Sequence, residues 1–385
     1  MNQRATKLFF ALLRSAVNGE KLEEKIKSEY SDQTVEEIEK LASMHDLSHL
    51  IIFALKNNQL LTKDKEEKEK TIFTAVFREE KSKFELELLI KNLEKERIDF
   101  IPLKGSVIRK YYPEAWMRTS CDIDVLVRKE QLKRATDLLV KQLNYKIKER
   151  ATHDVAFISP RGNTVELHFD LIEEGRAKNA EKPLGEIWEK AKVKSGYNHY
   201  LEMPDNLFYL YHVAHMAKHF EEGGCGIRPF IDLYLLDTTI EYDLKERNEL
   251  LEEAQLLVFA EQCRKLSKVW LENIESNQLL DKMEEFIVTG GVYGNAENRV
   301  SVKKSREGGK ARYIFSRIFV PYDKLKRYYP ILEKHPLLTP FMQVRRWFML
   351  LRPSVYKMAK KEMELSNKSN KNINSTKEFL ENIGL

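Results

Sequence analysis

Two aspartates, Asp122 and Asp124, flank one isoleucine inside an otherwise apolar segment, residues 121–127. The segment is typical of a buried strand, in which side chains two residues apart project from the same face. Two carboxylates held side by side repel each other unless a cation or a shared proton compensates their charge. Hard oxygen ligands of this kind suit Mg²⁺ or Mn²⁺, ions that bind phosphate groups. The pair therefore predicts a divalent cation site for chemistry on phosphates.

A short apolar strand upstream ends in Lys104-Gly105-Ser106. Gly105 allows the backbone to approach a phosphate closely, and Ser106 offers a hydroxyl at the start of a predicted helix. We expect the unpaired N–H groups of that first helical turn to bind an anion. Lys104 and Arg118 are candidate partners for a triphosphate, and Arg118 is the better bidentate clamp.

A third acid comes from the alternating segment 164–169, in which Glu166 and His168 share one face. Asp170 lies one step further on that face and is the alternative third carboxylate. His168 is either a partner of a metal ligand or acceptor, or a core histidine. A Gly-Ser turn, an Asp-x-Asp strand and a third acid, in this order, predict nucleotidyl transfer with two metal ions. The aspartate pair would bridge the metals, while Glu166 would complete the site or accept the proton of the acceptor hydroxyl.

Three histidines, His212, His215 and His219, recur at the spacing of one helical face. Imidazoles so placed can bind zinc, but the glutamate of the metalloprotease motif is missing between them. We favour a polar helix face at a domain boundary over a metal site. A third interpretation has His215 and His219 facing the cleft and contacting phosphate or acceptor, with Asp232 paired to one of them.

The composition predicts a globular protein with a highly charged surface, because 42% of the 385 residues are hydrophobic and 32% are charged. A net charge of +5 does not by itself indicate a nucleic-acid partner. Three cysteines without paired spacing (Cys121, Cys225 and Cys263) favour a reduced, cytoplasmic protein. No stretch approaches the ~18 apolar residues of a transmembrane segment, and Arg14 follows an N-terminal apolar run that predicts an amphipathic helix.

The order of the predicted elements indicates an α+β fold with a small mixed sheet flanked by N- and C-terminal helical regions. Short strands are predicted between residues 100 and 171, with a hairpin turn at 160–163, and helices before and after them. We predict an N-terminal helical region at 1–97, a core at 98–184 and a C-terminal helical domain at 185–385. A polar, basic loop is predicted at about 290–312.

Four motifs together carry a resemblance to a known family: Leu-Lys-Gly-Ser, Tyr-Tyr-Pro, Arg-x-x-x-Asp-Ile-Asp-Val-Leu-Val and Val-Glu-Leu-His. They resemble the uncharacterised bacterial nucleotidyltransferases of the DNA polymerase β-like superfamily, as do the later segments 215–219, 228–233 and 321–330. The resemblance covers most of the chain, weakly in the first 80 residues. It implies a polymerase β-like sheet and a metal-dependent NTP-binding site, but no acceptor. The family often has aspartate where this chain has Glu166, and the gap between Ser106 and Asp122 is longer than in many members of the superfamily.

The sequence thus predicts metal-dependent transfer of a nucleotidyl group to a hydroxyl-bearing acceptor, with two Mg²⁺ or Mn²⁺ ions. AMP is favoured because ATP is the commonest donor, and the acceptor is a small molecule, a protein or an RNA. One alternative is a toxin-like enzyme that modifies tRNA or protein, suggested by the basic residues of segment 299–312. Another is a nucleotide-binding scaffold without catalysis, which the cost of clustered acids argues against.

Overall fold

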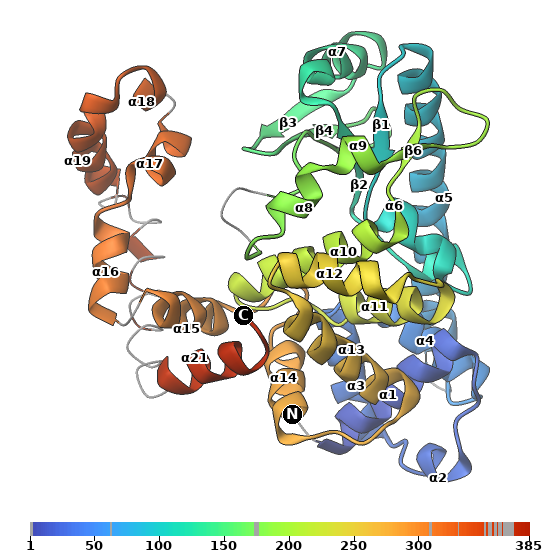
Figure 1. Ribbon diagram of the computed structural model, residues 1–385. Coiled ribbons are helices and arrows are strands. Elements are labelled where there is room, and N and C mark those ends of the chain that lie inside the picture. Colours follow the sequence, from blue (N-terminus) through green and yellow to red (C-terminus); the bar gives the residue numbers. More distant parts are fainter. Residues whose placement is uncertain are drawn as a thin grey trace.

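A mixed five-stranded sheet lies at the upper right of the molecule in the view of Figure 1. The computed structural model describes residues 3–61, 64–172, 177–307, 310–329, 331–349 and 373–385, with a few isolated residues between 352 and 364. The strands, in the spatial order β1-β2-β5-β4-β3, are β1 (Phe100–Pro102), β2 (Asp122–Val127), β5 (Thr164–His168), β4 (Asp154–Ile158) and β3 (Lys146–Arg150). β2 and β5 run parallel, and the other neighbours run antiparallel.

Helices precede, connect and follow these strands. The N-terminal helices are α1 (Gln3–Asn18), α2 (Glu24–Lys27), α3 (Asp32–Met44), α4 (Ser48–Asn57) and α5 (Lys65–Lys95). The elements between and just after the strands are α6 (Gly105–Ile108), η1 (Arg109–Tyr111), η2 (Ala115–Met117), η3 (Lys129–Gln131), α7 (Leu132–Asp137), η4 (Leu138–Gln142), α8 (Glu181–Gly185), α9 (Ile187–Lys190), β6 (Lys192–Val193) and β7 (Leu201–Glu202). The later helices are α10 (Asp205–Glu221), α11 (Arg228–Thr239), α12 (Leu244–Glu253), α13 (Leu257–Glu272), α14 (Gln278–Val288), α15 (Ala296–Arg306), α16 (Lys310–Ile318), α17 (Tyr322–Tyr328), α18 (Ile331–Lys334), η5 (Pro336–Leu338), α19 (Thr339–Met349) and α21 (Ile373–Asn382).

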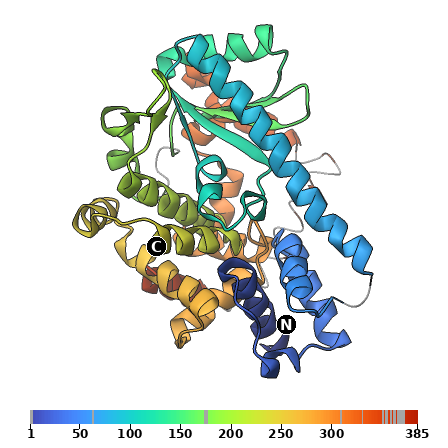
Figure 2. The same ribbon diagram turned by 90° about the vertical axis from the view of Figure 1, so that its right-hand side faces the viewer.

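One face of the sheet is apolar and is covered by α5 and α7. Ile123, Val125 and Val127 of β2 project from this face and pack in one core with Leu89 and Leu93 of α5. Figure 2 shows α5 extending from the N-terminal helices along the sheet. The C-terminal half of α5 therefore packs on the sheet, although the sequence assigns it to the N-terminal region.

The N- and C-terminal helices share a second core below the sheet in Figure 1. Phe10 of α1 stacks on Trp270 of α13, with ring centroids 4.5 Å apart. Leu12, Leu50 and Phe230, from α1, α4 and α11, are fully buried in the same core. The helical regions on the two sides of the sheet in sequence thus pack together in space.

The prediction of a polar, basic loop at about 290–312 is wrong over most of that range, because residues 296–306 form α15. The Asn295 side chain caps this helix by accepting a hydrogen bond from the Asn298 N–H at 2.7 Å. Val302 on the inner side of this helix is buried, and Arg306 at its end forms an ion pair with Glu221 at 2.8 Å. Capping and packing outweigh the polar composition that suggested a loop. Residues 308 and 309 lie outside the described residues.

The α+β class predicted from the sequence, a small mixed sheet flanked by helical regions, is confirmed. The domain boundaries after residues 97 and 184 stay a prediction. No helix in the described part of the chain has the length and apolar character that crossing a bilayer requires.

Candidate active site

The register of three strands gathers acidic side chains on the sheet face opposite α5. Asp124 of β2 lies directly across from Glu166 of the parallel strand β5. The turn between β4 and β5 is held by a hydrogen bond from the Ser159 N–H to the Asn163 carbonyl at 2.9 Å, which sets the register of that hairpin. Because alternate residues share a face, Asp122 projects beside Asp124, and His168 beside Glu166.

Asp124 is the buried centre of this arrangement, with 1% of its surface exposed. Its Oδ1 accepts a hydrogen bond from Lys104 Nζ at 2.7 Å and lies 2.8 Å from His168 Nε2. Burial works against the charged carboxylate, but Lys104 and His168 outweigh it and hold the pKa of Asp124 below its usual range. The same pairing raises the pKa of Lys104 against the opposing effect of its own burial. Asp124 is therefore an anion at neutral pH, with Lys104 as its counter-charge.

Asp122 forms no ion pair of this kind among the described residues, and the charge of Lys104 only partly offsets the effects that raise its pKa. Burial raises its pKa, and the neighbouring charges of Asp124 and Glu166 raise it further. Its Oδ1 accepts a hydrogen bond from Ser120 Oγ at 2.9 Å, which fixes the side chain. The carboxylate is thus held at a place where its negative charge is costly.

Glu166 is the carboxylate that the structure brings to Asp124, with 26% of its side chain exposed. Its charge also acts on Asp122, although Asp122 lies outside the group of close ligand atoms. One ligand atom from each of Asp124, Glu166 and His168 lies within 4.8 Å of the other two. Asp170, the alternative drawn from the sequence, is exposed beyond the end of β5 and lies outside this group. The strand ends at His168, so the alternation that would have aligned Asp170 stops before it.

A fourth acid, Asp154, was missed in the sequence. It begins β4 directly across from His168, so it projects from the same face as Glu166 and is 8% exposed. Burial raises its pKa. Counting back across the predicted hairpin turn would have found it, but an acid at the start of a strand resembles an ordinary turn residue. We call Lys104, Asp122, Asp124, Asp154, Glu166 and His168 the sheet cluster.

The Lys104-Gly105-Ser106 turn lies at the edge of the sheet cluster. Lys104 has a φ of +45°, a strained conformation for a residue with a side chain, and in it Nζ reaches Asp124. The sequence predicted unpaired backbone N–H groups in the first turn of α6, and this prediction is wrong for two residues. Ser106 N–H donates to the Leu103 carbonyl and Val107 N–H to the Lys104 carbonyl. The side-chain hydroxyl of Ser106, in contrast, is buried and has no hydrogen-bond partner among the described residues.

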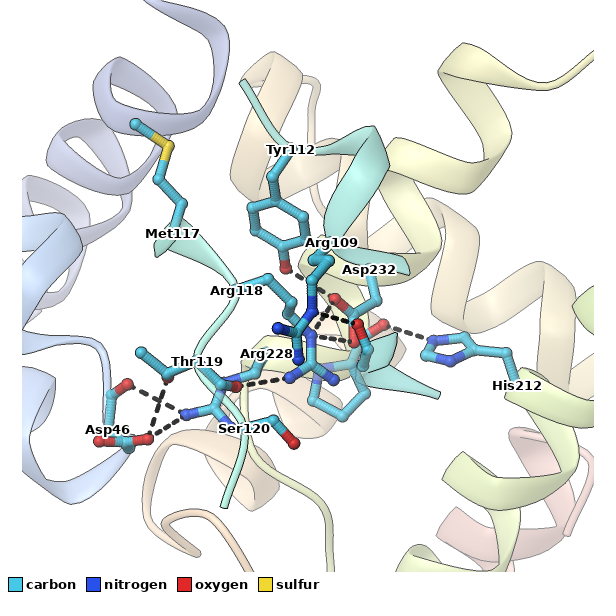
Figure 3. A network of polar contacts seen from close by, with 12 residues as sticks. Asp46, Arg109, Tyr112, Met117, Arg118, Thr119, Ser120, His212, Arg228 and Asp232 are labelled. Carbon is cyan, nitrogen blue, oxygen red and sulfur yellow. Dashed lines mark hydrogen bonds and ion pairs between the residues drawn. The ribbon is translucent and has the colours of Figure 1, made fainter. Parts of the chain in front are cut away.

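Arg118 lies between the turn and the helices, and Asp232 of α11 fixes it (Figure 3). Its Nε donates to both oxygens of Asp232 at 2.7 and 3.0 Å, and Tyr112 Oη donates to Asp232 Oδ1 at 2.7 Å. One interpretation of the sequence paired Asp232 with His215 or His219. The structure instead pairs it with Arg118. Burial opposes the charge of Arg118, but Asp232 outweighs it and raises the pKa of the guanidinium.

Further ion pairs extend this network to the N-terminal helices (Figure 3). Arg228 of α11 pairs with Asp46, which also accepts a hydrogen bond from Thr119 Oγ1 at 3.2 Å. Arg109 of η1 pairs with Glu79 of α5, and its Nε donates to the Gly105 carbonyl at 2.8 Å. We call the six charged side chains the interface network: Asp46, Glu79, Arg109, Arg118, Arg228 and Asp232.

The three histidines of α10 do not form one group. His212 Nε2 forms a hydrogen bond with the Pro229 carbonyl at 2.9 Å (Figure 3). The rings of His215 and His219 instead pack edge to face, with their centroids 4.5 Å apart. Burial lowers the pKa of His215 well below its usual value and that of His219 to about 4, and the charge of Lys104 lowers both further. Both imidazoles are therefore neutral at pH 7 and lie within the electrostatic range of Lys104.

The carboxylates of the sheet cluster fit a divalent cation. Oxygen donors from two adjacent strands converge there, and the charge that they accumulate is only partly compensated by Lys104. Mg²⁺ and Mn²⁺ favour such donors. Asp124 and Glu166 offer the oxygens that lie close together, and Asp122, on the same face of β2, would add a third donor.

The family of this chain follows from comparison with known proteins. Searches of curated proteins and of solved structures find no significant match. A family model described as uncharacterised nucleotidyltransferase matches residues 31–272, which include the whole sheet cluster and the interface network. The match confirms the resemblance seen in the motifs, and it covers more than half of the chain, so this protein belongs to the family of uncharacterised nucleotidyltransferases.

Proposed function

We propose that this chain transfers a nucleotidyl group, preferably AMP, from an NTP to an acceptor hydroxyl and releases pyrophosphate, with two Mg²⁺ or Mn²⁺ ions. The observation that supports this most is the alignment of Asp124 with Glu166 across parallel strands, beside Asp122 and the Lys104-Gly105-Ser106 turn. ATP is the favoured donor because it is the most abundant NTP. The three cysteines, which are free, favour a cytoplasmic location.

Asp122, Asp124 and Glu166 would hold the metal ions. Bound there, the ions would neutralise triphosphate charge and polarise the phosphorus that is attacked. His168 supports this site because it holds Asp124 at 2.8 Å and so limits the rotation of that carboxylate. Glu166 is more exposed than Asp124, which suits it to accept the proton of the acceptor hydroxyl as well.

The nucleotide would lie along the Gly105 turn. Lys104 would be a point charge for the triphosphate, and Ser106 Oγ, which has no partner in the described part of the chain, would be a hydrogen-bonding hydroxyl. Arg118 would contact phosphate through guanidinium nitrogens other than Nε, because Asp232 already engages Nε. Asp232 is then a positioning residue for Arg118. His215 and His219, being neutral, would accept hydrogen bonds from the acceptor.

The test is incorporation of α-labelled NTP. The protein is incubated with each labelled NTP, Mg²⁺ or Mn²⁺, and a cell extract that is then divided into protein, RNA and small molecules. Label from ATP should enter one fraction with release of pyrophosphate, and the double variant Asp122→Asn, Asp124→Asn should abolish both while retaining its circular dichroism spectrum. Turnover in that variant would refute the proposal. Metal-independent NTP binding without turnover would favour the scaffold.

An RNA acceptor is the second candidate, and residues 310–349 support it. This segment holds nine basic and two acidic residues, a net charge of +7, whereas the whole chain carries +5. Its helices α16 to α19 lie apart from the sheet in Figure 1 and expose Phe315 (63%), Phe341 (70%) and Phe348 (67%). Basic residues interleaved with exposed aromatic rings are typical of surfaces that stack on single-stranded RNA.

Salt dependence distinguishes this candidate. If the acceptor is RNA, the affinity for a labelled RNA pool should fall steeply as salt rises, and Phe341→Ala with Phe348→Ala should weaken binding without changing its salt slope. Weak binding at low salt that neither substitution alters would exclude an RNA acceptor at this surface.

A further inference from the structure

A second group of possible metal ligands lies beside the proposed Mg²⁺ site and shares only His168 with the carboxylate group. One ligand atom each from His153, Asp154 and His168 lies within 4.8 Å of the other two. His153 directly precedes β4, Asp154 begins that strand, and His168 ends the neighbouring strand β5 across from Asp154. The hairpin register that aligns Glu166 with the aspartates therefore also builds this group.

His168 connects the two groups through its two ring nitrogens. Nε2 lies 2.8 Å from Asp124 Oδ1 and 3.6 Å from Glu166 Oε2, so its proton is directed to the carboxylates. Nδ1 is buried and has no hydrogen-bond partner among the described residues. His168 is only 2% exposed, so water reaches it poorly. A buried imidazole nitrogen without a partner is costly, and a metal ion is one of the few ligands that can satisfy it.

The donor chemistry of this group differs from that of the carboxylate site. Two imidazoles and one carboxylate are an N/O set that suits Zn²⁺ and similar transition-metal ions, whereas Mg²⁺ favours oxygen alone. Three protein ligands leave a fourth tetrahedral position for water. A zinc-ligating histidine commonly donates its other N–H to a carboxylate, which is the relation between His168 and Asp124.

We propose that His153, Asp154 and His168 form a second cation site that binds Zn²⁺ or a similar transition-metal ion, with His168 ligating through Nδ1. Binding fixes the tautomer of His168 with the proton on Nε2, and thereby orients Asp124. His153 Nε2 lies 3.4 Å from Asp154 Oδ1, but this contact does not involve His168 and so does not explain why all three side chains converge. The inference does not depend on nucleotidyl transfer and is tested without it.

Direct metal titration of the full-length protein tests the site. Chelator-treated protein is titrated with Zn²⁺ by calorimetry in millimolar Mg²⁺, which saturates a carboxylate site, and Co²⁺ is then substituted as a spectroscopic probe of nitrogen ligands. We expect one Zn²⁺ per chain in the presence of Mg²⁺ and visible Co²⁺ absorption of a tetrahedral site. His153→Ala should weaken Zn²⁺ binding about a hundredfold or more.

Two controls make the outcome specific. His199→Ala removes a comparable histidine, which pairs with Asp99 at 2.8 Å, and should leave Zn²⁺ binding unchanged. Asp122→Asn removes a proposed Mg²⁺ ligand and should also leave it unchanged. If His153→Ala fails to fold, as judged by circular dichroism and size-exclusion elution, Asp154→Asn replaces it with the same expectation.

Three results would overturn the proposal. The wild type does not bind Zn²⁺ in Mg²⁺, neither folded variant changes the affinity, or Asp122→Asn abolishes the binding and so places the ion among the carboxylates. None of them would affect the test for nucleotidyl transfer, which is measured by label incorporation.

Discussion

The two buried polar clusters of this protein differ in their charge balance. The sheet cluster brings together four acids, but only Lys104 and His168 are available as cationic partners. The interface network pairs three acids with three arginines, Arg118 with Asp232, Arg228 with Asp46 and Arg109 with Glu79. Asp124 of the sheet cluster and Asp232 of the interface network are each only 1% exposed, so burial alone does not distinguish the two clusters.

The imbalance indicates what each cluster does. A surplus of buried negative charge destabilises the fold unless a cation binds, so the sheet cluster has the character of a ligand site. Balanced pairs contribute no such surplus, and removing one partner leaves a buried charge uncompensated. Substitutions in the two clusters should therefore have opposite effects on activity and on stability.

The largest expected effect on activity is that of Asp122→Asn. The substitution keeps the shape of the side chain but removes a proposed metal ligand, so the rate of nucleotidyl transfer should fall by about 10³-fold. In metal-free buffer at pH 7 the melting temperature should rise, because burial and the charge of Asp124, which together raise the pKa of Asp122, do not act on a neutral amide. Label incorporation and thermal unfolding of the same preparation measure both. A lower melting temperature with activity retained would mean that Asp122 stabilises the fold and does not serve the reaction.

Asp232→Asn should have the opposite profile. It leaves the buried guanidinium of Arg118 without its counter-charge, which should lower the free energy of unfolding by about 3 kcal/mol or more. Urea denaturation measures this loss. The matched control is Asp46→Asn in the half-exposed pair with Arg228, which should cost less than about 1 kcal/mol. Equal losses in the two variants would show that burial of the pair does not determine its contribution.

Acid should destabilise the neighbourhood of the interface network through His45. Its Nε2 donates to the Val288 carbonyl at 3.1 Å, and Nδ1 accepts from the Ile227 N–H at 3.4 Å, so the ring is bound in its neutral form. Burial lowers its pKa from 6.5 to about 4. The unfolded chain therefore binds a proton before the folded one does. The contribution of His45 to stability should be constant above about pH 6.5 and fall by about 3 kcal/mol as the pH drops towards 4.

The His45 contribution is isolated by a comparison of pH slopes. Other buried histidines add to the slope of the wild type, so urea unfolding is measured between pH 4 and pH 8 for both the wild type and His45→Gln. The variant should be less stable at pH 7 and show a shallower slope. An identical slope would mean that His45 is not held neutral by the fold.

The sequence predicted the sheet cluster better than the interface network because the two depend on different ranges of contact. Asp122, Asp124 and Glu166 follow from the period of two in a strand, which is a local property. Arg118 and Asp232 are 114 positions apart, and Arg228 and Asp46 are 182 apart. No local period specifies such partners, so the sequence suggested Arg118 as a phosphate clamp without its anchor.

Two pairs of residues show what the local pattern of the sequence could not predict. Glu166 and Asp170 have the same parity, and only the end of β5 at His168 separates them. Asp154 and His168 are paired by the hairpin register, which the sequence indicates through its turn residues but does not fix. Strand ends and registers therefore limited the prediction of the site more than the identity of its residues did.

Gly105→Ala should have the smallest effect, and it tests how Ser120 positions Asp122 in the sheet cluster. A Cβ at this position would lie 3.3 Å from both Cβ and Oγ of Ser120, the residue that holds Asp122. Ser120 must shift by a few tenths of an ångström, which displaces the carboxylate but breaks no ion pair. The rate should fall about tenfold while the melting temperature changes little, because small displacements at a reacting centre cost rate more than stability. Ser120→Ala, which removes the hydroxyl without adding bulk, should produce a similar loss of rate, and the double variant should be little worse than either single one. Additive losses would instead mean that Gly105 acts on the nucleotide directly and not through Ser120.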